Sequence, residues 1–171
     1  LDGADHLTGA IWKADPLEPE VWLTEIGQSA HYLGRDGNRY YEYDNLASLK
    51  SGIGHNNVPM QEGWFVDENR STLYVKSLND PAAHSWQVVL LSNALQVDSQ
   101  DWVWIEGIEI QYYDRGLALD NASNIVIRKN KIHNVNQGIK TNWTGGEDRS
   151  NNTRIEYNEI YDILVNEWPW D

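Results

Sequence analysis

Residues 124–132 read Asn124-Ile125-Val126-Ile127-Arg128-Lys129-Asn130-Lys131-Ile132, and this stretch decides the fold because it occurs three times. The first copy runs from Trp102 to Ile110, 22 positions earlier, and the third runs from Asn152 to Ile160, 28 positions later. The extra residues of the longer spacing fall around residues 143–150, a polar, Gly-containing segment typical of a loop. A period of this length indicates a repeat protein in which each copy packs on its neighbours.

A second block repeats with the same spacing, at residues 94–98, 116–120 and 138–142. Apolar and polar residues alternate within both blocks, which predicts strands with one buried face. The residues expected to point inward are Val103, Ile105, Ile125, Ile127, Ile155, Leu95, Val97, Leu117, Leu119 and Ile139. The sequence therefore predicts an all-β fold, a right-handed parallel β-helix with coils of about 22 residues. The first coil is expected near Trp86, because Val88 lies 22 positions before Ile110.

The outward positions test this register independently. One outward column reads Glu106, Arg128 and Glu156, and a second reads Glu109, Lys131 and Glu159. Both columns alternate in sign, as neighbouring strands about 4.8 Å apart would favour. Asn130 and Asn158 occupy equivalent positions, which predicts a short ladder of Asn side chains.

The N-terminal half lacks the repeat and is interpreted as a small β-rich capping module, residues 1–85, ahead of the coils in residues 86–171. Within it we expect a β-hairpin over residues 64–76, a strand at 40–43 and about one helical turn at 45–50. The coil that follows Ile160 is incomplete. We therefore expect the natural chain to continue, and the terminal surface to contact either that continuation or another chain end-on.

The amino-acid composition limits the classes of partner and the kinds of site that the protein can have. The formal charge is −13 with a pI of about 4.6, which disfavours nucleic acid and anionic membranes. There is no cysteine, so disulfides, thiolate metal sites and a cysteine nucleophile are excluded. No apolar run is long enough to insert into a membrane. Nine Trp and nine Tyr stand beside one Phe, a bias that suits sugar stacking and the rim of a β-rich core equally well.

Residues 124–134 with 137–139, and again 152–162, resemble the repeat of right-handed parallel β-helix proteins of the pectin-lyase-like superfamily. The hairpin at 64–76 is similar to what precedes the helix in many secreted bacterial members. The resemblance implies an extracellular or cell-surface protein with a polysaccharide or oligosaccharide ligand, and, for an enzyme, polysaccharide lyase or glycoside hydrolase activity. The chain lacks the acidic cluster of polygalacturonases and the Asp-Pro-His-Asp signature of alginate epimerases. A non-catalytic structural or adhesive protein is therefore the alternative.

The outward face of the strands that carry Leu95, Leu117 and Ile139 is the predicted ligand surface. One of its columns places Asp98 beside Asp120 without a base between them, and like charges in adjacent strands are costly. The predicted carbohydrate-binding residues are Trp143, Asp98, Asp120, Lys140 and Asn142. Calcium at Asp98 and Asp120 is the one cofactor considered, and the candidate catalytic residues are Lys140, Arg115 and Asp120.

Each of these candidate sites also has a structural interpretation without a ligand, and the sequence leaves it open. The whole surface also fits solvated loop-edge residues, and Asp114 with Arg115 fits a local ion pair. His133, next to Asn134, is interpreted as a turn histidine bonded to backbone.

Overall fold

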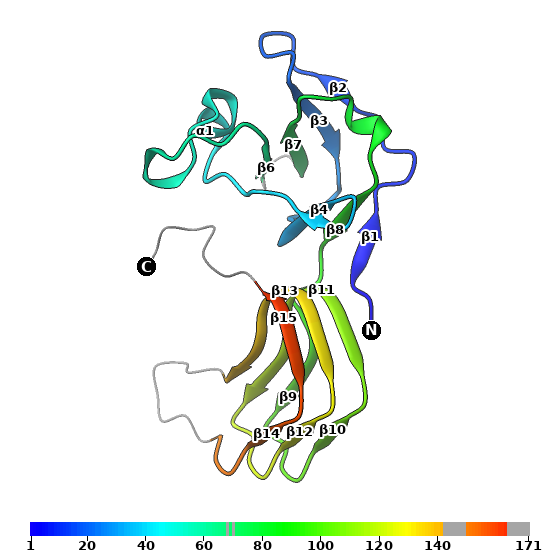
Figure 1. Cartoon of the computed structure of the whole chain (residues 1–171), viewed down its shortest axis with the longest axis vertical. Coiled ribbons are helices and arrows are strands. Elements are labelled where there is room, and N and C mark those ends of the chain that lie inside the picture. Colours follow the sequence, from blue (N-terminus) through cyan, green and yellow to red (C-terminus); the bar gives the residue numbers. More distant parts are fainter. Residues whose placement is uncertain (68, 70, 142–149, 164–171) are drawn as a thin grey trace. The chain divides into compact units, whose positions relative to one another are not determined.

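The computed structural model describes residues 1–67, 69, 71–141 and 150–163, and the described chain is mostly β (Figure 1). Its contacts divide it into two compact units. We call residues 5–90 the antiparallel unit, and residues 1–4 with 91–163 the parallel unit. No helix in these residues has the length and apolar character needed to cross a bilayer.

The antiparallel unit contains two sheets. The first has the order β2-β3-β7-β6, with β2 Lys13–Ala14, β3 Val21–Glu25, β6 Gly63–Asp67 and β7 Thr72–Lys76. The second has the order β1-β8-β4-β5, with β1 Ala4–His6, β4 Tyr32–Arg35, β5 Asn38–Arg39 and β8 Trp86–Val89. The helices are α1 Leu46–Ser51 and the 3-10 turns His55–Asn57 and Pro81–Ala83.

Three sequence expectations can be compared with this unit. The hairpin over residues 64–76 is confirmed, because β6 and β7 pair antiparallel from Gly63–Lys76 to Asp67–Thr72. The helical turn is also present as α1, where the Asn45 side chain accepts a hydrogen bond from the backbone of Ser48. The strand expected at 40–43 is absent, since that segment forms a single bridge from Glu42 to Trp64.

Aromatic residues dominate the core of the antiparallel unit. Trp64 and Trp86 are almost fully buried, and their indole N–H groups donate to the backbone oxygens of Tyr40 and Pro81. Trp86 also packs edge-on against Tyr40 and at a tilt against Trp12. Burying a Trp is favourable only when its N–H finds an acceptor, and both residues meet that condition.

The parallel unit contains two parallel sheets, and corresponding strands of successive copies pair in register. Figure 1 shows these strands running side by side. The first sheet has the order β10-β12-β14, with β10 Trp104–Glu106, β12 Val126–Arg128 and β14 Arg154–Glu156. The second has the order β15-β13-β11-β9, with β9 Asn93–Asp98, β11 Glu109–Asp120, β13 Lys131–Thr141 and β15 Glu159–Ile163.

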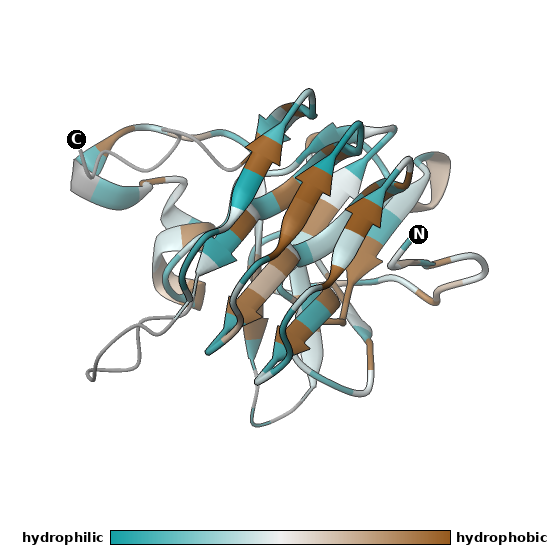
Figure 2. Ribbon diagram, turned by 90° about the horizontal axis from the view of Figure 1, so that it is seen from below, coloured by the Kyte–Doolittle hydropathy of each residue, from teal (hydrophilic) through white to brown (hydrophobic). Residues whose placement is uncertain are grey.

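The spacings of 22 and 28 residues read from the sequence are the pairings observed. Ile105 pairs with Ile127 and Ile127 with Ile155, while Leu95 pairs with Leu117 and Leu117 with Ile139. Figure 2 shows apolar and polar residues alternating along these strands. The extension of the repeat to Val88 is wrong, because Val88 pairs antiparallel with Leu33. The domain division at residue 86 stays a prediction.

Left-handed backbone conformations recur at the same positions of each copy. One column is Trp102, Asn124 and Asn152, a second is Gly107, Lys129 and Tyr157, and a third is Tyr112, Asn134 and Asp162. All nine residues have φ between 48° and 71°. A left-handed residue turns the chain sharply, so these columns are the corners of the repeat. The first two columns lie between strands, and the third lies within β11, β13 and β15.

The predicted Asn ladder is present at one corner. Asn130 accepts a hydrogen bond from the backbone of Ile108 and donates to the oxygen of Ile105, and Asn158 repeats the pattern with Asn130 and Ile127. Asn130 is 2% exposed. The ladder satisfies backbone groups that the turn between two strands would otherwise leave unpaired.

The core of the parallel unit is aliphatic, and its edge is open. Ile125, Ile127 and Ile132 are fully buried, whereas Ile155 is 51% exposed. The prediction that Ile155 is buried with Ile105 and Ile127 is wrong, because β14 is the last strand of its sheet and no further described strand covers it. The outward column is confirmed where Arg128 lies 3.0 Å from Glu106 and Lys131 lies 3.3 Å from Glu109.

Candidate functional site

The register places the predicted ligand residues on neighbouring strands. Asp98 at the end of β9 pairs with Asp120 at the end of β11, and Lys140 of β13 pairs with Ala118 of β11. Parallel strands are about 4.8 Å apart, so the two carboxylates start from adjacent backbone positions, and the ammonium starts one strand further on, diagonal to Asp120. Asp98 is exposed, and Asp120 and Lys140 are half-buried. Whether these residues bind a ligand stays a prediction.

The remaining predicted binding residues, Trp143 and Asn142, lie outside the described residues. They belong to segment 142–149, which follows β13 directly in the chain. The described part of the surface is therefore made by three strand ends.

The two carboxylates differ in their local partners. Asp98 accepts a hydrogen bond from the Ser99 hydroxyl at 2.9 Å, and Asn121 donates to the same hydroxyl at 3.2 Å. Neither Asp98 nor Asp120 forms an ion pair with a base in the described part of the chain. Both carboxylates therefore keep capacity to accept hydrogen bonds from a ligand.

Calcium at this place stays a prediction as well. Within residues 1–67, 69, 71–141 and 150–163, no three His, Cys, Asp or Glu side chains come together in a way that could hold a metal ion. A calcium ion prefers six to eight oxygen ligands, and two carboxylates supply only part of that number.

Arg115, a candidate catalytic cation, is held by its own neighbours. Its Nε donates to Gln137 at 3.2 Å and its Nη2 lies 3.6 Å from Asp114, which in turn accepts a hydrogen bond from Asn136. Asp114 and Arg115 form the local ion pair that the sequence left open. These contacts hold the guanidinium of Arg115 against Gln137 and Asp114, so it would have to exchange them to bind a substrate.

His133 lies in strand β13, directly before the left-handed residue Asn134, so its place beside a turn is as expected. Its ring stacks on Tyr161 with a centroid distance of 4.8 Å and an angle of 2°, and its Nε2 lies 3.1 Å from Glu109. Asn134 contacts the other ring nitrogen at 3.1 Å. The interpretation as a turn histidine therefore misses a packed cross-strand contact. The equivalence of His133 with Tyr161, 28 positions apart, is the signal in the sequence that could have found it.

Lys131 completes this cluster. Hydrogen bonds from His133 and then Lys131 hold the pKa of Glu109 below its ordinary value, and hydrogen bonding with Tyr161 and Glu109 raises the pKa of Lys131. Lys131 therefore stays a cation at neutral pH and cannot serve as a base. Both ring nitrogens of His133 have partners, and through Glu109 and Tyr161 the cluster links three neighbouring strands.

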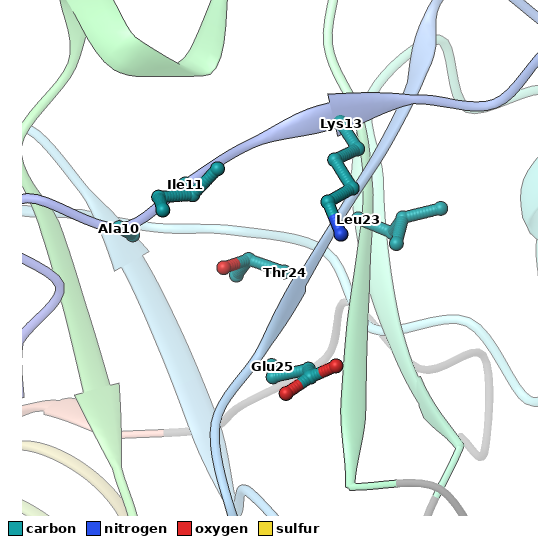
Figure 3. Close-up of a pocket in the computed structure, with 6 residues that line it drawn as sticks. All are labelled: Ala10, Ile11, Lys13, Leu23, Thr24 and Glu25. Carbon is teal, nitrogen blue, oxygen red and sulfur yellow. The ribbon is translucent and has the colours of Figure 1, made fainter.

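The antiparallel unit has a hollow of about 310 Å³ beside the edge of β2 and β3, which is drawn in Figure 3. Ala10, Ile11, Lys13, Leu23, Thr24 and Glu25 line it. Its polar groups are one base, one acid and one hydroxyl, which is too few convergent groups to define a reaction.

No family model and no curated protein matches this chain. Among solved structures, the complex of XylC with xylose is similar, with a TM-score of 0.59 and 13% sequence identity. The similarity covers 95% of this chain but 42% of the XylC chain. At this identity the likeness shows the fold alone, and it includes both units of the chain.

Proposed function

We propose that the chain is part of a secreted, carbohydrate-binding protein whose parallel unit belongs to a right-handed parallel β-helix. We propose further that polysaccharide lies along the ends of β9, β11 and β13. The observation that carries this is the in-register pair Asp98 and Asp120, with Lys140 on the next strand in register with Ala118. The outward face of stacked parallel strands gives a row of evenly spaced polar groups, which suits a polymer of repeating units.

The β-helix proposal rests on four features of the parallel unit. Strands pair parallel at the repeat spacings, corners are left-handed at equivalent positions, Asn side chains form a ladder, and the core is aliphatic. The right hand is expected because parallel crossovers take that hand almost without exception. These features and the sequence resemblance support membership of the pectin-lyase-like superfamily, from which a secreted location follows as part of the proposal.

The xylose in the XylC complex supports a carbohydrate ligand in general, while the residues of this surface suggest its chemistry. Asp98 and Asp120 accept hydrogen bonds from sugar hydroxyls, and the ammonium of Lys140 pairs with a carboxylate on the polymer. A uronate-containing polysaccharide satisfies all three groups. Calcium bridging Asp98, Asp120 and a uronate would satisfy the two carboxylates, without a role for Lys140.

Catalysis would demand more than binding. A polysaccharide lyase needs a base for the proton next to the carboxylate and a cation for the enolate, roles open to Lys140, Arg115 and Asp120. Because Arg115 is held by Asp114 and Gln137, the described geometry favours binding over turnover.

A structural or adhesive β-helix is the second candidate, and the open edge favours it. Ile155, Ile160 and Tyr161 are 51%, 42% and 38% exposed on the last described strands of both sheets. Such an edge is satisfied by another strand from the same or a second chain.

Isothermal titration calorimetry of the 171-residue chain tests the binding proposal. Oligogalacturonate and xylohexaose should be titrated with and without calcium, against wild type, Lys140→Ala and Asp120→Asn. We expect Lys140→Ala to weaken oligogalacturonate binding by about tenfold, the effect of roughly 1.4 kcal/mol, and to reduce its salt dependence. Glu156→Gln on the other sheet is the matched control and should leave oligogalacturonate affinity unchanged. Equal affinity of Lys140→Ala and wild type would refute this site.

A further inference from the structure

Large aromatic side chains surround the three-stranded sheet β10-β12-β14. Trp102 precedes β10 and is 80% exposed, Trp104 lies within β10 and is 59% exposed, and Tyr157 follows β14 and is 81% exposed. We call these three residues the aromatic face. They contrast with Trp64 and Trp86 of the antiparallel unit, which are 1% and 3% exposed. Exposed single apolar residues are common, but three large aromatics around one small sheet require an explanation.

Two members of the aromatic face also have unfavourable backbone conformations. Trp102 has φ 63° and Tyr157 has φ 56°, in the left-handed region. The residues at the same corner as Trp102 are Asn124 and Asn152, and Gly107 and Lys129 share the corner of Tyr157. Asn and Gly adopt this conformation easily, whereas bulky side chains do not. Neither burial nor backbone preference therefore explains Trp102, and an outlier of this kind points to function.

The third member, Trp104, is held in place. The guanidinium of Arg128 lies over its ring at 4.5 Å, and Glu106 binds Arg128 at 3.0 Å and Lys129 at 3.1 Å. A cation above one face of an indole fixes the ring, which is prepared for binding because little side-chain freedom is left to lose.

The charges around the aromatic face are already paired with one another. Glu106 pairs with Arg128 and Lys129, and Arg154 pairs with Glu156 at 2.8 Å. Three bases and two acids leave this sheet near neutral, although the whole chain carries −13. An anionic ligand would have to compete with existing pairs for these bases, whereas a neutral ligand would not.

We propose that the aromatic face binds a neutral polysaccharide by stacking of sugar rings on Trp102 and Trp104, with Tyr157 as a third contact. The apolar C–H face of a pyranose lies flat on an indole, and the surrounding paired side chains accept and donate hydrogen bonds to its hydroxyls. By strand spacing and rise the three residues lie within about 20 Å of each other, so a short oligosaccharide can span them. The aromatic face lies on and beside the β10-β12-β14 sheet, whereas Asp98, Asp120 and Lys140 belong to the β15-β13-β11-β9 sheet, and the inference stands without that site.

The test pairs a binding measurement with a stability measurement. The probes are xylohexaose and cellohexaose by calorimetry, and insoluble xylan and cellulose by pull-down. Trp102→Asn introduces the residue type that is found at the two equivalent corners, Asn124 and Asn152. We expect this variant to keep or raise the melting temperature while affinity for the neutral hexasaccharides falls at least tenfold. Trp104→Val, which copies Val126 of the next strand, should weaken binding similarly.

The controls separate this proposal from the acidic-polymer site. Leu17→Asn, at an apolar residue of the antiparallel unit that is 82% exposed, should leave neutral-sugar affinity unchanged, and Trp102→Asn should leave any oligogalacturonate affinity unchanged. A lower melting temperature for Trp102→Asn would show a structural role and overturn the proposal. So would wild-type chain that binds none of the neutral probes, or sedimentation showing that Trp102→Asn abolishes self-association instead.

Discussion

The two units use the same residue type in opposite ways. In the antiparallel unit, Trp64 and Trp86 are buried and their N–H groups are bonded to backbone oxygens. In the parallel unit, Trp102 and Trp104 are exposed, and the core is made mostly of Ile, Leu and Val with Tyr113 as its buried aromatic residue. An antiparallel unit without a repeat fills its core with large rings, whereas stacked copies fill theirs with branched aliphatic columns. The number of aromatic residues therefore does not indicate function. The position of an aromatic residue within the repeat is the informative property.

The largest expected effect tests the aliphatic column itself. Ile127 is fully buried between Ile105 and Ile155, so Ile127→Asp places an unpaired charge in an apolar site and should cost several kcal/mol. Urea denaturation followed by circular dichroism measures the loss. Ile155→Asp is the matched control, because the same column position is 51% exposed on the edge strand. Equal losses at the two positions would mean that the column is not a core.

The next effect tests the aromatic core against the aromatic face. Trp64→Ala removes a buried ring and leaves a cavity, which should cost about 3–5 kcal/mol. Trp104→Ala removes an exposed ring and its contact with Arg128, and should cost about 0.5–1 kcal/mol. Chemical denaturation midpoints at constant m-value compare them. A loss at Trp104 as large as that at Trp64 would contradict the contrast between the units.

The repeat allows most strand pairings of the parallel unit to be predicted from the sequence. Hydrophobic alternation and two outward charge columns set the same register, so aligning the copies is enough to place Ile127 and Arg128 beside their partners. The Asn ladder follows from the same alignment, because Asn130 and Asn158 are equivalent positions.

The sequence does not predict features that depend on tertiary contacts, such as which strand pairs with which and whether a residue is covered. Val88 matches the repeat spacing, yet an alternating apolar strand suits an antiparallel partner equally, and Leu33 takes that place. Ile155 matches the buried column, but burial needs a neighbour on both sides. The exposed rings of Trp102 and Tyr157 could not be told from core residues, since composition does not reveal a left-handed corner.

A smaller effect concerns a single ion pair of the antiparallel unit. Arg35 donates to both oxygens of Glu62, at 2.8 and 2.9 Å, and the pKa of Glu62 is lowered mainly by these bonds. A carboxyl with a lowered pKa stabilises the fold above its unfolded pKa of about 4.5 and loses that contribution as the pH falls through the folded value. Glu62→Gln should therefore cost about 1 kcal/mol at pH 7. Denaturation at pH 3 should show the difference from wild type shrinking, and a constant difference would exclude the linkage.

The smallest effect concerns the exposed charge column of the parallel unit. The pKa of Glu106 is also lowered, by hydrogen bonds from Arg128 and then Lys129, so its contribution likewise fades as the pH falls below the ordinary Glu range. Its carboxylate is open to solvent, however, and salt at 1 M reduces the screening length to about 3 Å. Glu106→Gln should thus lower the melting temperature less than Glu62→Gln does, and 1 M salt should remove more of its effect. The same measurement tests whether the charge column helps to set the register of the strands. If burial alone set it, the effect of Glu106→Gln on the melting temperature would not depend on salt. If Glu106→Gln lowered the melting temperature as much in 1 M salt as in dilute buffer, the alternating charges would not contribute to strand stacking, and the aliphatic column would have to set the register unaided.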